Sequence, residues 1–232
     1  MNKHIVITGP SSGIGFYLAK ELSLNNKVMG LCRRKPKINE KNFSFIKTDL
    51  LKEKSIKQAL KKIKKIDILI NNAAITKTKK KNKFQNFKEI LDTNLLAPFF
   101  LTELLKKKLS NSENPVVINM CSINSYQGFP NNPGYNSSKG GLLLLTKSMA
   151  IDLSKHNIRV NSISPGYFKT AMTKKSYKNK FQKKKRLSRM ILNRWGEPKD
   201  LLGIVEFLIS KKSSYITGQD FIIDGGWLSK GL

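Results

Sequence analysis

The N-terminal stretch HIVITGPSSGIG, residues 4–15, joins a short apolar segment to a glycine-rich turn. Four of the five residues at 4–8 are β-branched or threonine, which is typical of a buried strand. The glycines follow in the spacing T-G-x-x-x-G-x-G, before a helical pattern at 14–24. In a strand–turn–helix unit, such glycines let the backbone approach a diphosphate at the helix N-terminus. The stretch predicts a dinucleotide-binding unit, whose ligand would lie near Thr8, Gly9, Ser11, Ser12, Gly13, Ile14 and Gly15.

Apolar segments alternate with amphipathic ones along the chain. Strands are predicted at 4–8, 27–32, 43–47, 66–71, 115–120, 158–164 and 220–224. Helices are predicted at 14–24, 52–64, 86–109 with a kink at Pro98, 134–155 and 198–209. This alternation predicts an α/β fold, with one domain over residues 1–232: a Rossmann-type, doubly wound parallel sheet of about seven strands flanked by helices on both faces. Ligands of such sheets bind at the carboxyl ends of the strands.

The composition bounds the class of protein. The chain has 232 residues, of which 39% are hydrophobic, and this suffices for one well-covered core. Its apolar runs are far shorter than a bilayer span, and the N-terminal one is too short for a signal peptide. We therefore expect a cytoplasmic protein without a membrane span. Cys32 and Cys121 are expected to be buried and unpaired, and with only two histidines no metal site is predicted.

The formal net charge of +29 is extreme. Such a charge attracts anionic partners, whether nucleic acid, membranes or acidic substrates. An abundance of Lys, Asn and Ile is also what A/T-rich codon usage produces, so the charge has a compositional explanation too. The sequence has no basic groove interleaved with aromatic residues and no nucleic-acid recognition motif. No specific nucleic-acid partner is expected, and a nucleic-acid-binding protein on this scaffold is the remote alternative.

Residues after the next strands complete the expected dinucleotide site. Asp49-Leu50 follows the third strand, where a carboxylate can accept a hydrogen bond from an adenine amino group. Asn72-Ala73-Ala74 follows the fourth strand, where small side chains leave room for a ribose. Arg33-Arg34 follows the second, where an acidic residue would bind the ribose 2′-hydroxyl of NAD. Two guanidinium groups suit a 2′-phosphate instead, so the pair predicts a preference for NADP(H) over NAD(H), which stays possible.

The stretch GYNSSKGG, residues 134–141, places Tyr135 one helical turn before Lys139. Positions i and i+4 share a helix face, so the phenol and the ammonium are expected to point the same way. A cation about 4 Å from a phenol contributes roughly 4 kcal/mol, or about three pKa units, in its ionisation. We therefore expect Lys139 to lower the pKa of Tyr135. Ser122 follows the fifth strand, where its hydroxyl can hold a carbonyl oxygen, and Asn94 precedes Pro98, where a distorted helix can free a carbonyl for water.

Taken together, these motifs resemble the classical short-chain dehydrogenase/reductase family over essentially the whole chain, and most closely its 3-oxoacyl-[acyl-carrier-protein] reductases. The motifs that carry the resemblance are the glycine loop at 8–15, Asn71-Asn72-Ala73, Asn94, Ser122, YNSSK at 135–139, PGYFKT at 165–170 and the closing YITGQDFIIDGGW. Two positions depart from the family pattern. Ala74 stands where glycine is frequent and Cys121 where a second serine is common, and both replacements are small.

The resemblance implies an oxidoreductase that transfers a hydride between NAD(P)(H) and a ketone or secondary alcohol. Tyr135 would be the general acid/base, and Lys139 would lower its pKa and hold the nicotinamide ribose. Ser122 would orient the substrate oxygen, and Asn94 would anchor a water in a proton relay. Further cofactor contacts would come from Pro165, Gly166 and Thr170, while Asn161 would be a structural support. The resemblance also implies a homodimer or homotetramer built through the long helices.

Segment 169–195 is expected to be a lid over the substrate. Its first part, 169–189, carries ten Lys or Arg residues and no acidic residue. A solvated lid of biased composition is one explanation, and recruitment of an acidic substrate is the other. That substrate would be an acyl group on the acidic acyl carrier protein, or a phosphorylated or carboxylated small molecule. A 3-oxoacyl thioester is the preferred substrate here, and another small carbonyl or alcohol, such as a sugar or polyol, is the alternative.

Overall fold

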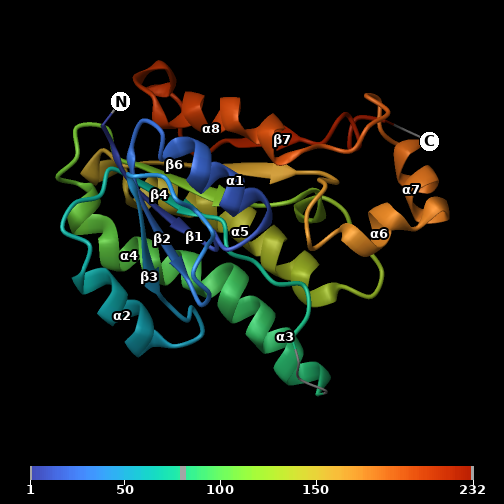
Figure 1. Cartoon of the computed structure of the whole chain (residues 1–232), viewed down its shortest axis with the longest axis horizontal. Helices are drawn as coiled ribbons and strands as arrows, with labels where there is room; N and C mark the ends of the chain where they lie inside the picture. Colours follow the sequence, from blue (N-terminus) through green and yellow to red (C-terminus); the bar gives the residue numbers. More distant parts are fainter. Residues whose placement is uncertain (1, 79–81, 231–232) are drawn as a thin grey trace.

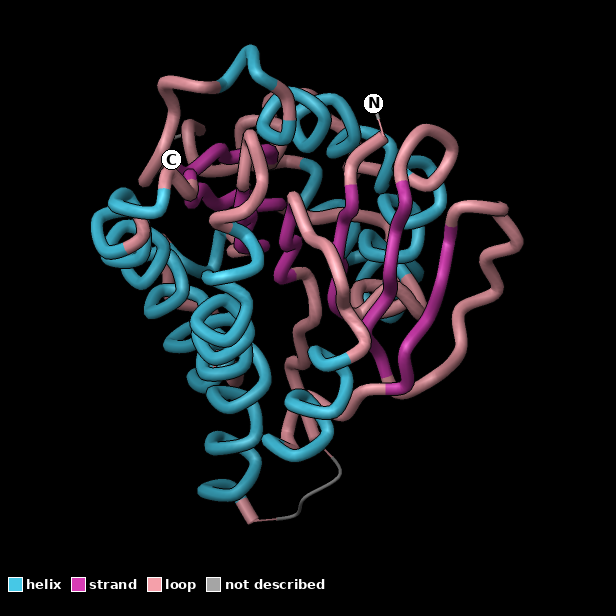
Figure 2. The backbone as a smooth tube through the Cα atoms, turned by 90° about the vertical axis from the view of Figure 1, so that its left-hand side faces the viewer, coloured by secondary structure: helices cyan, strands magenta, loops and turns pink. Residues whose placement is uncertain are grey.

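Seven parallel strands form one sheet in the order β3-β2-β1-β4-β5-β6-β7. This computed structural model describes residues 2–78 and 82–230, so the outermost ends of the predicted domain lie outside the described residues. The strands are β1 His4–Thr8, β2 Lys27–Cys32, β3 Phe43–Lys47, β4 Ile68–Asn71, β5 Val116–Met120, β6 Arg159–Pro165 and β7 Asp220–Ile223. All seven were predicted from the sequence, with bounds that differ by two residues at most. Figure 2 shows several of them running side by side.

Helices cover both faces of the sheet, as predicted (Figure 1). One face carries α1 Gly13–Leu22 and α8 Leu202–Ile209, and the other carries α2 Glu53–Lys61, α4 Ala97–Leu109 and α5 Pro133–Asp152. The alternation of side chains along β1 shows why two layers are needed. Ile5 and Ile7 pack into the core under α1 and α8, while Val6 packs into the core under α2 and α4. Full burial of one such side chain contributes about 1.5–3 kcal/mol.

The predicted helix at 86–109 is interrupted by a π-helical turn. It consists of α3 Lys83–Leu91, the π-helix Asp92–Leu96 and then α4. A kink at Pro98 was the wrong form of distortion, because the irregular turn lies just before the proline. The physical reason is that Pro98 has no N–H group, which in an α-helix would bond to the carbonyl of Asn94. The helix also starts earlier than predicted, because Asn82 caps it by accepting from the N–H groups of Phe84 and Gln85.

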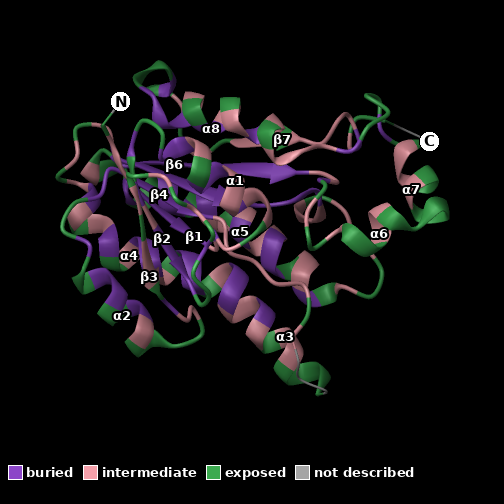
Figure 3. Ribbon diagram, in the orientation of Figure 1, coloured by how far each residue is buried: buried purple, intermediate pink, exposed green. Residues whose placement is uncertain are grey.

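The segment between β6 and α8 contains two short helices that the sequence did not predict. They are α6 Lys174–Lys178 and α7 Lys180–Leu187, which lie beside each other at one end of the molecule (Figure 1). Neither helix contains a buried residue (Figure 3). Asn179 begins α7 by accepting a hydrogen bond from the N–H of Gln182 at 2.9 Å. The predicted helix at 198–209 starts as a 3-10 turn, Pro198–Leu201, before it becomes α8. Within the described residues, no helix is long and apolar enough to cross a membrane.

Candidate active site

The glycine loop after β1 is fastened to the turn after β4. The hydroxyl of Thr8 accepts hydrogen bonds from the N–H groups of Asn72 at 3.0 Å and Ala73 at 2.9 Å. The Asn72 side-chain amide returns a bond to the carbonyl of Thr8 at 2.9 Å. Thr8 is buried, so its hydroxyl serves to hold the two turns together. The loop and the turn were both predicted to be near a cofactor, and the structure brings them into contact.

Two glycines are required where these turns meet. Gly9 has φ +71°, and a Cβ there would lie 2.9 Å from the Cα of Ala73. A Cβ on Gly15 would lie 2.2 Å from the side-chain nitrogen of Asn72. Gly13, with φ +62°, faces the side chain of Thr170, whose Cβ would be 3.5 Å from an added Cβ. The glycine loop, the turn after β4 and the base of the lid therefore lie close together, and we call the place where they meet the cradle.

The cradle includes the N-terminus of α1. Its N-cap residue, Ser12, is extended and makes no side-chain capping bond, and the first turn contains no acidic residue. The first N–H groups of a helix have no partner within the helix, and the dipole gives this end a partial positive charge. Backbone N–H groups at such an end suit the oxygens of a diphosphate. The cradle therefore offers free backbone N–H groups and a partial positive charge that suit a diphosphate.

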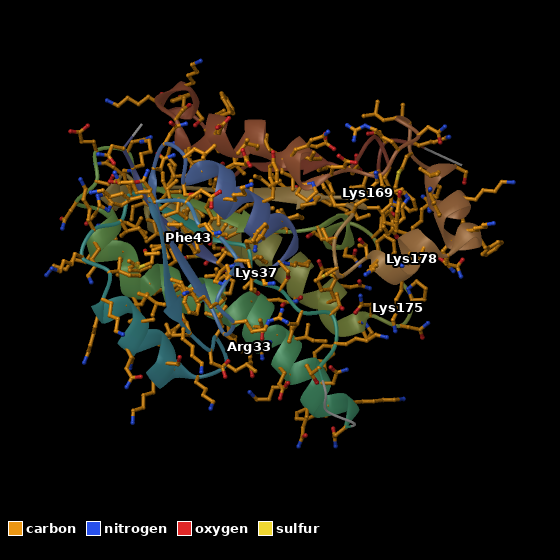
Figure 4. All side chains as sticks on the ribbon, viewed as in Figure 1. Arg33, Lys37, Phe43, Lys169, Lys175 and Lys178 are labelled. Carbon is orange, nitrogen blue, oxygen red and sulfur yellow. The ribbon has the colours of Figure 1, made fainter. Side chains whose placement is uncertain are left out.

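The outer parts of the predicted dinucleotide site are less enclosed. Arg33 and Arg34 are exposed directly after β2, and Figure 4 shows Arg33 and Lys37 on this side of the molecule. Asp49 is partly engaged in its own turn, because its carboxylate accepts a bond from the N–H of Leu51 at 3.1 Å. Leu50 packs against the core under α2. Two cationic side chains thus lie where the sequence predicted a 2′-phosphate contact.

Three residues of the predicted catalytic set lie together at the carboxyl end of β5. Tyr135 and Lys139 do share one face of α5, with the Lys139 nitrogen 5.7 Å from the centre of the Tyr135 ring. Ser122 follows β5, and its hydroxyl interacts with the phenol of Tyr135 by a hydrogen bond that lowers the tyrosine pKa. Lys139 is only 2% exposed, and its ammonium donates to the carbonyl of Met120 at 2.5 Å. The cluster therefore holds a phenol, a hydroxyl and an ammonium in one corner, where Ser122 and Lys139 are buried and Tyr135 is half-buried.

Burial dominates the ionisation of this corner. It raises the pKa of Tyr135 to about 12, against the opposing effect of Ser122. It also lowers the pKa of Lys139 to about 8, while the neighbouring Cys121 opposes that change. The net pKa of Tyr135 is therefore raised, because removing a phenolate from water costs more than the hydrogen bond of Ser122 returns. That Lys139 lowers the pKa of Tyr135 stays a prediction. At neutral pH the tyrosine holds its proton and can act as a proton donor.

Asn94 lies fully buried in the π-helical turn, with its side chain saturated by protein groups. Its amide nitrogen donates to the carbonyl of Ile75 at 2.9 Å and to the hydroxyl of Ser138 at 3.0 Å. Its amide oxygen accepts from the N–H of Ile75 at 2.8 Å. The side chain therefore ties the segment after β4 to α5. A water at this position would have to bind the main-chain carbonyl of Asn94.

A set of polar residues that the sequence did not single out positions the catalytic corner. Asn124 donates from its N–H to the hydroxyl of Ser122 at 3.2 Å and from its side chain to Asn136 at 2.6 Å. The hydroxyl of Ser125 donates to the carbonyl of Lys139 at 2.9 Å. These bonds fasten the turn after β5 to the helix that carries the tyrosine. The polar residues are visible in the sequence as INSYQG and YNSSK. However, amide side chains in loops can bond many groups, so the sequence did not show which residues pair with one another.

The remaining predicted residues lie on the lid side. Pro165 ends β6, and the N–H of Gly166 donates to the carbonyl of Ile223 at 3.0 Å. A Cβ on Gly166 would lie 2.7 Å from Asp224, so the loop after β6 needs a glycine to pass the loop after β7. Asn161 bonds the backbone of Ile216 and Gln219, as expected of a structural support.

The two cysteines are free and buried, as predicted. Burial raises the pKa of Cys121 to about 12, so the thiol behind Lys139 stays neutral. In residues 2–78 and 82–230, no cluster of three or more His, Cys, Asp or Glu could hold a metal ion.

A parallel sheet with a glycine cradle at its carboxyl edge, beside a tyrosine paired with a buried lysine, defines an NAD(P)-binding oxidoreductase. Comparison with known proteins identifies the family. A family model described as enoyl-(acyl carrier protein) reductase matches residues 9–228. The chain is 33% identical to a 2-dehydro-3-deoxy-D-gluconate 5-dehydrogenase of Bacillus subtilis, over 98% of this chain and 95% of the relative. It is 34% identical to a 3-oxoacyl-[acyl-carrier-protein] reductase of Rickettsia bellii, over 96% and 95%.

Solved structures agree with this assignment. A 4-hydroxyisoleucine dehydrogenase complexed with NADH has a TM-score of 0.91 and 32% identity, covering 99% of this chain and 100% of that one. A putative 2-deoxy-D-gluconate 3-dehydrogenase from Agrobacterium tumefaciens with bound NADP has a TM-score of 0.89 and 31% identity, covering 98% and 96%. The chain belongs to the short-chain dehydrogenase/reductase family. It is an oxidoreductase acting on the CH–OH group of donors or on the corresponding carbonyl.

Proposed function

We propose that this enzyme reduces a ketone to a secondary alcohol with NADPH, and that Tyr135 supplies the proton. The observation that carries the proposal is the corner of Ser122, Tyr135 and Lys139 beside the cradle. A phenol that keeps its proton at neutral pH, next to a serine hydroxyl, is suited to protonate a carbonyl oxygen. Carbonyl chemistry is preferred to reduction of a carbon–carbon double bond, because the two curated relatives are named for carbonyl or alcohol substrates.

The cofactor would be held by the cradle and by the residues around it. Gly9, Gly13 and the α1 N-terminus suit the diphosphate, and Ala73 and Ala74 suit a ribose. Lys139 and Thr170 would hold the nicotinamide half, and Asp49 the adenine. When bound, the nicotinamide supplies or accepts the hydride. The preference for NADP(H) over NAD(H) is supported by Arg33 and Arg34, since guanidinium groups pair with a phosphate and no carboxylate follows β2.

The chain's own residues would then carry the proton. Ser122 donates to the substrate oxygen and fixes its position beside the phenol of Tyr135. As the carbonyl carbon gains a hydride, negative charge develops on that oxygen, and the phenol transfers its proton there. The ammonium of Lys139 stabilises the phenolate that remains. A water on the main-chain carbonyl of Asn94, which Pro98 leaves without an α-helical donor, would return the proton; oxidation would use the same groups in reverse.

The lid, 169–195, would close over the substrate. Lys169, Lys175 and Lys178 are exposed on this part of the molecule, on the side away from Arg33 (Figure 4). Their charge supports an anionic substrate in either of two forms, a free organic acid or an acyl group on an acidic carrier protein. Relatives named for sugar acids and for 3-oxoacyl carrier-protein substrates have nearly the same identity to this chain, 33% and 34%. Identity alone therefore does not choose between them.

Assembly into a homodimer or homotetramer is also proposed. Large apolar side chains are exposed on the long helices, with Phe99 and Leu104 on α4 and Leu144 and Ile151 on α5. Burying such side chains between copies would recover hydrophobic free energy. A cytoplasmic location is proposed as well, because nicotinamide cofactors are available there.

The experiment that tests the function is transfer of a labelled hydride. NADPH deuterated at both C4 positions is incubated with the enzyme and a panel of 3-oxoacyl thioesters, keto sugar acids and small neutral ketones. We expect NADPH oxidation and one deuterium on the carbinol carbon of at least one product, in a single stereochemical configuration. The proposal fails if NADPH binds but no ketone in any of the three groups takes up deuterium. A double-bond substrate reduced in their place would assign the chain to the chemistry named by its family model.

A further inference from the structure

Beneath the lid lies a cluster of aromatic residues that contains hydrogen-bond donors without partners. Its buried members are Trp195 and Trp227, 2% and 4% exposed, and both rings pack against Tyr167, at centre distances of 5.3 and 4.8 Å. The cluster also contains Ile123, which directly follows Ser122 in the sequence. It therefore reaches the turn after β5 that carries Ser122.

Three donor groups reach into this cluster from different segments. Arg186 of α7 lies over the Tyr167 ring, with its guanidinium carbon 4.5 Å from the ring centre, and is 5.8 Å from that of Trp195. One guanidinium nitrogen of Arg186 and the indole nitrogens of both tryptophans are buried with no hydrogen-bond partner. All three are donors that cannot accept. Leaving a buried donor unpaired is costly, so such groups are few in native proteins and point to an absent acceptor.

The nearby carboxylates are committed elsewhere. Asp224, beside Trp227 in sequence, accepts bonds from the N–H groups of Gly226 and Leu228 at 2.8 Å each. Glu197 pairs with Lys169 at 2.8 Å, and Asp200 pairs with Arg194 at 2.7 Å. Among the ion pairs of the described residues, none involves Arg186. Among the described residues, these carboxylates therefore leave the three donors without an acceptor.

We propose that Arg186, Trp195 and Trp227 form a subsite for the carboxylate of a small keto or hydroxy acid. The inference rests on the proposed function and gives it a substrate class. The forked guanidinium pairs with the two oxygens of a carboxylate, and an indole N–H can donate to one of them. Aromatic walls exclude water and so strengthen the pairing. The reacting carbon of the same molecule would lie at Ser122 and Tyr135.

This subsite separates the two substrates that remained open. A 3-oxoacyl thioester carries a neutral acyl chain and offers no carboxylate to Arg186. A sugar acid or an amino acid carries one at the end of a short chain. The subsite thus favours a free organic acid, and the exposed lysines of the lid would only raise its local concentration.

The chain offers an optical test that does not depend on turnover. Its two tryptophans are both in the subsite, so intrinsic tryptophan emission reports on that place alone. Butanoate and butanamide, which differ in charge and little in size, are titrated into the enzyme with saturating NADP⁺. We expect butanoate to change the emission at a concentration at least tenfold lower than butanamide. Equal half-saturation by the two, or tighter saturation by inorganic phosphate than by butanoate, would overturn the assignment.

Single substitutions on α7 test which positive charge gives the preference for butanoate over butanamide. Arg186→Gln should lower the preference for butanoate at least tenfold, whereas Lys185→Gln removes the same charge from an exposed position of α7 and should leave it unchanged. Arg186→Lys keeps the positive charge but loses the forked guanidinium, so it should retain an intermediate preference for butanoate. This variant replaces Arg186→Gln in the test if Arg186→Gln does not fold. An unchanged preference in either Arg186 variant, or an equal loss in Lys185→Gln, contradicts the subsite.

A kinetic arm distinguishes this proposal from the proposed function. The kcat/KM of keto acids is compared with that of their amides, in the wild type and in Arg186→Gln. We expect an acid-over-amide ratio of ten or more that approaches one in the variant. Reduction of amides and acids at equal efficiency would sink the subsite and leave the ketone reductase standing. A saturable change in tryptophan emission with butanoate, without reduction of any ketone, would support the subsite and contradict the proposed ketone reductase.

Discussion

In the cradle, the hydroxyl of Thr8 and the side-chain amide of Asn72 are bonded to backbone, whereas three buried donors at the lid have no partner among the described residues. The polar side chains of the cradle are thus satisfied within the protein, and glycine is required where its two turns touch. In the lid region, the proposed carboxylate of the substrate would complete the contacts. This difference teaches why a cofactor site is recognisable from a short motif, while a substrate site depends on groups that are far apart in the sequence.

The largest effect is expected from a side chain placed in the cradle. Gly9→Ala puts a methyl group 2.9 Å from Ala73 at φ +71°, so we expect a loss of about 2–4 kcal/mol of unfolding free energy. NADPH affinity should fall at least a hundredfold where the variant folds. Gly203→Ala is the control, because nothing lies within 4 Å of its added Cβ. Melting curves and NADPH fluorescence titration check both, and a Gly9→Ala variant that matches Gly203→Ala would break the account of the cradle.

The second effect concerns the buried ammonium. Burial lowers the pKa of Lys139 to about 8, so its charge is present below pH 8 and is lost as the pH rises. Since the proposed mechanism needs that charge beside the phenolate, kcat for reduction should fall about tenfold per pH unit above 8. Lys139→Arg keeps its charge to high pH, so whatever activity it retains should not show this fall. A wild-type profile that is flat from pH 7 to 10, or a fall that persists in Lys139→Arg, would disprove the role.

The third effect tests the cofactor side. Replacing Arg33 and Arg34 together by alanine should raise the KM for NADPH about tenfold, because each exposed charge pair contributes at most about 1 kcal/mol and tenfold corresponds to about 1.4 kcal/mol for the two. The KM for NADH should change by less than twofold. Raising the salt concentration should reduce the difference between the two cofactors. Steady-state kinetics with both cofactors would reject the NADP(H) preference if the double variant affected them equally.

The smallest effect is expected in the π-helical turn. Pro98→Ala restores an N–H group that can bond the carbonyl of Asn94 in a regular helix, and so competes with water there. We expect kcat to fall about threefold, with unchanged NADPH affinity and unchanged or slightly higher stability. Leu96→Ala, on the exposed side of the same turn, is the control. If kcat in Pro98→Ala stays at the wild-type value, the carbonyl has no part in the relay.

The sequence predicted the regions whose structure is local. The alternation of apolar residues gave all seven strands, and one motif located the cradle, because glycines at fixed spacing have few structural uses. The i, i+4 spacing gave the common face of Tyr135 and Lys139. The spacing could not predict the pKa values of these two residues, because those depend on burial by residues distant in sequence, such as Met120.

The lid was the part that local patterns described least. Its lysine-rich sequence has no apolar periodicity, so helices α6 and α7 were not predicted. The cluster joins Arg186 and Trp195 of the lid to Trp227 after β7, and only the fold brings these two segments together. The π-helical turn was missed for a related reason: Pro98 signals a distortion, but neighbouring contacts decide its form.

The central claim is that Tyr135 supplies the proton, and single-turnover reduction in Tyr135→Phe tests it most directly. The substitution removes only a hydroxyl, so NADPH should bind within threefold of the wild-type affinity, measured by the change in nicotinamide fluorescence. With a substrate found in the labelled-hydride screen, we expect the rate of NADPH oxidation to fall at least a thousandfold, at the upper range for a lost general acid. A Tyr135→Phe enzyme that turns over within tenfold of the wild type would contradict the account.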